Sequence, residues 1–210
     1  MGQDEPLNPF ILIGFSFLVT IISSIFFYFY GVSADIASLF FDESKIMETV
    51  QNVTLLISAC LFLFFGKNLS LINRPPAYFM GLICIAFFLR EVELLDYADM
   101  APWMLFPFEG LGRLWLLIPL GIQIKALFLS RHIYLQNWTL YSFSYSGIFL
   151  LLSFLCLVLS WPFDRIEHFV DNPSYAEELL ESNAYLIWLF ISLRIRKDSQ
   201  WIDQKLVNKN

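Results

Sequence analysis

Long apolar runs alternate with short polar stretches along this chain of 210 residues. Each run is close to the length that a helix needs to cross a hydrocarbon core of about 30 Å. The runs do not follow the strand period of two, and a backbone in lipid must satisfy its own hydrogen bonds, so helices are expected. The predicted spans are Phe10–Tyr30, Ile46–Gly66, Ala77–Tyr97, Gly110–Ser130, Trp138–Trp161 and Tyr175–Leu193.

The composition places the whole chain in the membrane class. Hydrophobic residues make up 58% of the chain and charged residues 15%, whereas charged residues are about a quarter of a soluble domain. The polar stretches are each too short to enclose a core of their own. We therefore predict an all-α, polytopic membrane protein in which residues 1–210 form one domain. This domain is a bundle of six transmembrane helices with a short basic tail over residues 194–210.

The positive charges between the runs predict the orientation of the bundle, because Lys and Arg favour the cytoplasmic side. Nine of the 13 Lys and Arg residues fall on one predicted side, among them Lys67, Arg74 and those of the tail. Both termini are therefore expected in the cytoplasm, with the chain in the inner (plasma) membrane. Fifteen of the 19 acids fall on the opposite side. Because acids contribute little to orientation, the outer face is expected to use carboxylates or to tolerate them.

The stretch FFLREVELLDY, residues 87–97, places charges where hydrocarbon is expected. On a helix Arg90, Glu93 and Tyr97 share one face, whereas Glu91 points about 160° away from Glu93. Arg90 would lie roughly 10 Å below the outer end of the span, where a lone cation is costly. We expect Arg90 to pair with Glu93 or with a carboxylate from a neighbouring helix.

Three other spans also bring polar groups into the outer half of the predicted bundle. Ionisable residues inside a membrane are rare and commonly functional, so we predict one polar cavity that opens to the outer side. The alternatives are an ion-pair network that holds the helices together, and separate charges solvated among the lipid headgroups. The candidates for substrate or ion binding are Arg90, Glu93, Glu48, Asn52, Arg113, Glu109, Glu178, Glu181 and Tyr185, and those for acid–base catalysis are Glu48, Glu181 and Glu93.

Cysteine and histidine give no recognisable metal or disulfide pattern. Cys60, Cys84 and Cys156 are isolated within apolar runs and lack CxxC spacing, so we interpret them as small hydrophobic residues. His132 and His168 are predicted on opposite sides of the membrane and cannot share a metal ion. The cofactor is left open, and a hard divalent cation held by oxygen ligands is the compatible candidate.

Two short stretches resemble the alkaline-ceramidase superfamily of membrane hydrolases. In ESKIMETVQNVTLLIS, Glu48, Asn52 and Ser58 resemble that family's Glu-x-x-x-Asn segment leading to a serine. LLDYADMAPWM, residues 94–104, resembles its Asp-Glu-x-Pro-Met stretch. The resemblance implies a pocket at the outer leaflet on a related scaffold.

The zinc chemistry of that superfamily depends on histidines, including a His-x-x-x-His pair on its last helix. The corresponding region here contains Glu177, Glu178 and Glu181 and no histidine, so the zinc ligands are absent. The six-helix layout also resembles that of uncharacterised bacterial inner-membrane proteins, a resemblance that implies no chemistry.

Three functions are compatible with these features. The first is a non-enzymatic membrane partner or assembly factor, whose acidic outer face and basic tail bind other membrane proteins or lipid headgroups. The second is a membrane-embedded hydrolase acting on lipid headgroups at the outer leaflet, with Glu181 or Glu48 as general base and Arg90 holding an anionic group. The third is a cation- or proton-coupled transporter. We favour the first, which needs no special geometry; the lipid bilayer is a partner in all three, and nucleic acid in none.

Overall fold

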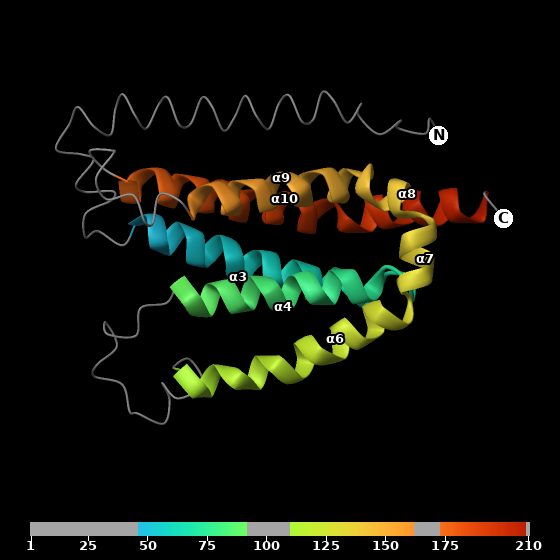
Figure 1. The fold of residues 1–210 in the computed structure, drawn as a ribbon, viewed down its shortest axis with the longest axis horizontal. Coiled ribbons are helices and arrows are strands. Elements are labelled where there is room, and N and C mark those ends of the chain that lie inside the picture. Colours follow the sequence, from blue (N-terminus) through green and yellow to red (C-terminus); the bar gives the residue numbers. More distant parts are fainter. Residues whose placement is uncertain (1–45, 92–109, 162–172, 209–210) are drawn as a thin grey trace. The chain divides into compact units, whose positions relative to one another are not determined.

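Regular structure in the described part of the chain is helical throughout (Figure 1). A computed structural model describes residues 46–91, 110–161 and 173–208. The predicted all-α class is confirmed for these residues, whereas the predicted first span, Phe10–Tyr30, lies outside them. The chain divides into two compact units. Unit 1 comprises Met1–Val50 and Thr139–Ile191, and unit 2 comprises Gln51–Trp138 and Ser192–Asn210.

Unit 2 contains most of the helices of the first half of the chain. They are α3 (Ile46–Gly66), whose first five residues belong to unit 1, α4 (Arg74–Glu91), the 3₁₀ helix η3 (Gly110–Leu116), α6 (Leu117–Leu129) and α7 (Arg131–Gln136). Among the described residues, one helix is both long and apolar enough to cross a membrane, namely α3 over Glu48–Gly66. Its bounds match those of the second apolar run.

α4 begins three residues before the predicted third span. Pro75 and Pro76 occupy its first turn, where the missing N–H groups have no helical partner to lose. The helix packs against η3 and α6 through a small core of Leu82, Leu89 and Leu116. On α3 the neighbouring Leu63 is so close that a Cβ at Gly81 would lie 3.0 Å from its side chain.

Unit 1 contains α8 (Trp138–Ser142), α9 (Tyr145–Ser160) and the first part of α10 (Pro173–Val207). Two helices thus occupy the range of the predicted fifth span, because Ser144 ends one and begins the other. Its backbone is extended, with φ −67° and ψ 161°, and its side chain caps α9 by accepting a hydrogen bond from the Gly147 N–H. A capping serine of this kind satisfies an amide that the first helical turn leaves unpaired.

The helix α10 is 35 residues long and continues well beyond the predicted sixth span. It extends 14 residues past Leu193, to Val207, through most of the basic tail. At a rise of 1.5 Å per residue this extension measures about 21 Å. The tail is therefore a defined helical surface, drawn in red in Figure 1.

Candidate functional site

The predicted candidates for a polar cavity are divided between the two units. Glu48, Glu178, Glu181 and Tyr185 belong to unit 1, and Asn52, Arg90 and Arg113 to unit 2. Glu93 and Glu109 lie outside the described residues. Convergence of all these residues on one cavity therefore stays a prediction.

In unit 1, α10 buries a carboxylate and a phenol on successive turns. Glu181 is 6% exposed and Tyr185 is fully buried. The ring of Tyr185 lies 5.6 Å from that of Trp188, whose indole N–H donates a 2.9 Å hydrogen bond to Ser153 Oγ on α9. α9 and α10 are thus joined by a polar contact inside unit 1, where side chains of both helices are buried.

In unit 2, Arg90 forms an ion pair with its sequence neighbour. Its guanidinium nitrogens Nε and Nη2 lie 2.9 Å and 2.5 Å from Glu91 Oε1, and its side chain is 50% exposed. The face argument had not selected Glu91, because adjacent side chains point apart on a helix. Long side chains at the last turn of α4 nevertheless reach each other along the helix surface.

The polar residues of α3 are in part satisfied by the helix itself. Ser58 is fully buried and donates a 2.7 Å hydrogen bond to the Thr54 carbonyl. The half-buried Asn52 has no hydrogen-bond partner for Oδ1 among the described residues. In the same part of the chain, no three His, Cys, Asp or Glu side chains are grouped as metal ligands would be.

A second polar cluster, absent from the sequence-based candidates, lies at one end of unit 2. The Asn73 amide Nδ2 donates to Ser199 Oγ at 2.8 Å and to Asp203 Oδ1 at 2.9 Å. The Ser70 hydroxyl donates to the same carboxylate oxygen at 3.1 Å. We call these four residues the latch, because they fasten the extension of α10 to the turn between α3 and α4. Asn73 and Ser199 are buried.

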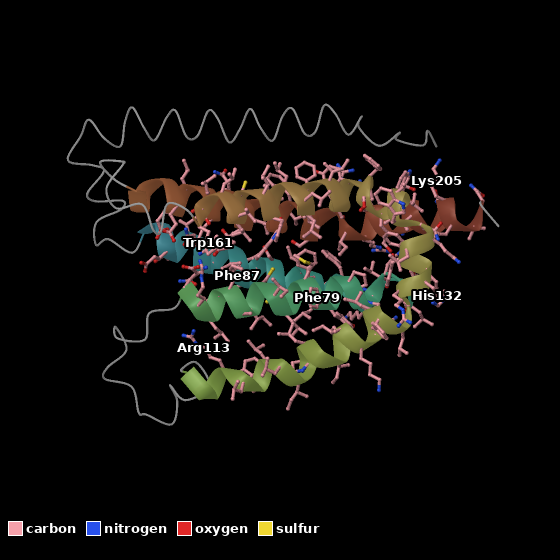
Figure 2. All side chains as sticks on the ribbon, viewed as in Figure 1. Phe79, Phe87, Arg113, His132, Trp161 and Lys205 are labelled. Carbon is pink, nitrogen blue, oxygen red and sulfur yellow. The ribbon has the colours of Figure 1, made fainter. Side chains whose placement is uncertain are left out.

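The latch determines which charges of the extension reach the surface. Its two acids, Asp198 and Asp203, are respectively buried and half-buried. The exposed positions share a polar or cationic side chain and form one face of the helix. This basic face consists of Arg196, Lys197, Gln200, Gln204 and Lys205; Figure 2 labels Lys205 near the end of α10.

The short helix α7 is fastened to the same turn. The Tyr134 hydroxyl donates a 2.6 Å hydrogen bond to the Ile72 carbonyl. Partial burial raises the pKa of Tyr134 above its ordinary value of 10.0, so the phenol stays a neutral donor at physiological pH. Arg131 and His132 of α7 are exposed (Figure 2).

Comparison with known proteins gives no relative for this chain: no family model, no curated protein and no solved structure matches it.

Proposed function

We propose that this chain is a multi-pass protein of the inner (plasma) membrane, with both termini in the cytoplasm. In this proposal it acts as a non-enzymatic membrane partner or assembly factor. The apolar helix α3 and the other apolar runs support the membrane setting. The basic face of α10 is then the docking surface.

One observation carries the proposal, namely the separation of charge on the extension of α10. Asp203 accepts two hydrogen bonds within the latch, and Asp198 is buried. The cations Arg196, Lys197 and Lys205 are exposed. A helix with its acids turned inward and its cations outward attracts anionic partners and repels basic ones.

The length of the extension favours a protein partner for this face. The headgroup layer on each side of a bilayer is about 5 to 8 Å deep. Lys205 lies 12 residues beyond Leu193, which is about 18 Å along the helix. Its neighbourhood therefore projects past the headgroups, where an acidic segment of another membrane protein can bind it.

Charge reversal tests this function. In the variant Arg196→Glu, Lys197→Glu, Lys205→Glu, we expect proteins that co-purify with the chain in mild detergent to fall at least tenfold, because three attractive charges become repulsive. The measurement is quantitative mass spectrometry of the purified complexes at low and high salt.

The matched control is Gln200→Ala, Gln204→Ala, which alters the same face without changing its charge. This variant should retain its partners. Equal recovery of the same proteins from the charge-reversed variant and the wild type would contradict the docking function.

A further inference from the structure

Two exposed cations of unit 2 lie directly over exposed phenylalanine rings. Lys67 Nζ is 4.5 Å from the centroid of the Phe64 ring, and Arg131 Cζ is 3.9 Å from that of Phe128. Phe64 is 56% exposed and Phe128 61% exposed. Each pair therefore presents an apolar ring and a positive charge together, at a spacing of three residues.

Both pairs stand where a helix ends. Phe64 belongs to the last turn of α3 and Lys67 follows its final residue, whereas Phe128 belongs to the last turn of α6 and Arg131 lies just beyond it. In the proposed membrane setting these ends meet the boundary of the hydrocarbon. The ring then lies at the edge of the acyl chains, and the cation reaches the level of the lipid phosphates.

Hydrogen bonds hold the segments that carry the two pairs. Tyr134 joins α7 to the α3–α4 turn at Ile72. Arg74 donates to the carbonyls of Lys67 and Leu69 at 3.1 Å and 3.3 Å, which fixes a third cation in the turn. Residues 64–74 and 128–137 contain no acid, so nothing within these segments neutralises the charge.

The opposite end of α4 shows the contrast. Arg90 also lies over a phenylalanine ring, with Cζ 5.1 Å from the centroid of Phe87. There, however, Glu91 pairs with the guanidinium. The ring and cation are the same kind of pair, but the local charge is cancelled.

We propose that Lys67, Arg74 and Arg131 form a binding surface for the phosphate groups of anionic phospholipids. The inference rests on the proposed membrane setting, but it does not depend on the docking role of α10. An acidic protein is the less suitable occupant, because the exposed rings beside the cations match the apolar edge of a lipid leaflet.

Lipid preference in nanodiscs tests the inference. The full chain is reconstituted with phosphatidylcholine alone or mixed with phosphatidylglycerol, and the retained lipids are counted by native mass spectrometry. We expect the wild type to retain phosphatidylglycerol at least fivefold in excess of its share, and Lys67→Gln, Arg131→Gln to lose this preference. The control Arg90→Gln should keep it, because its charge is already paired.

Three outcomes would overturn the inference. They are a preference that survives in Lys67→Gln, Arg131→Gln, an equal loss in Arg90→Gln, and full competition by inorganic phosphate or by a soluble acidic peptide. Failure of the chain to enter nanodiscs would instead contradict the membrane setting itself. Loss of lipid preference with unchanged protein partners would separate this surface from the docking face.

Discussion

Replacing Asn73 by alanine is expected to release the extension of α10 from the turn between α3 and α4. The amide of this buried residue donates to both Ser199 and Asp203. A neutral hydrogen bond contributes about 1 kcal/mol and one to a carboxylate about 1.5 to 3, so the loss should be about 2 to 4 kcal/mol. Hydrogen exchange should accelerate at least about 30-fold for residues 194–207, because their local opening becomes easier.

Asn68→Ala is the control for this prediction. Asn68 belongs to the same turn, and its side chain is exposed. Exchange over residues 194–207 should then stay at the wild-type rate. The latch would have no stabilising role if Asn73→Ala also left the exchange of this segment unchanged.

The second large effect is expected at the junction between α8 and α9. A Cβ at Gly147 would lie 2.0 Å from the Tyr141 carbonyl oxygen and 2.9 Å from that of Ser142. Both atoms belong to the backbone, so no side-chain rotation relieves the overlap. Gly147→Ala should therefore force the junction apart and lower stability by about 3 kcal/mol, measured as a fall in the thermal unfolding midpoint in detergent.

Gly121→Ala provides the comparison, because nothing lies within 4 Å of a Cβ placed at Gly121 on α6. Its midpoint should be unchanged or slightly higher, since alanine favours a helix over glycine by about 1 kcal/mol. Equal midpoints for the two variants would show that the approach of Gly147 to Tyr141 is not needed for folding.

Hydrophobic periodicity predicted the helical class and the bounds of α3, because these depend on the residues of the segment itself. It did not predict that Pro75 and Pro76 begin α4, since prolines in a first turn resemble those of a loop. It also gave one span where Ser144 separates α8 from α9. Capping depends on one residue, and an average over twenty apolar positions conceals it.

The latch could not be read from the sequence for a different reason. Asn73 lies 126 residues from Ser199 and 130 from Asp203, and no local pattern links such distant polar side chains. The tail was recognised as basic from its composition. Only the three-dimensional structure shows that its acids are turned inward, because this depends on where α10 meets the turn.

Cross-linking between positions 73 and 199 tests the central claim most directly. Cysteines at these two positions, in a chain whose Cys60, Cys84 and Cys156 are replaced by alanine, should form a disulfide rapidly under mild oxidation in native membranes, because the side chains are in hydrogen-bond contact. A cysteine at the exposed position of Gln200 should not pair with position 73. If position 200 cross-links as readily as position 199, or if neither does, the latch and the basic face that it orients are contradicted.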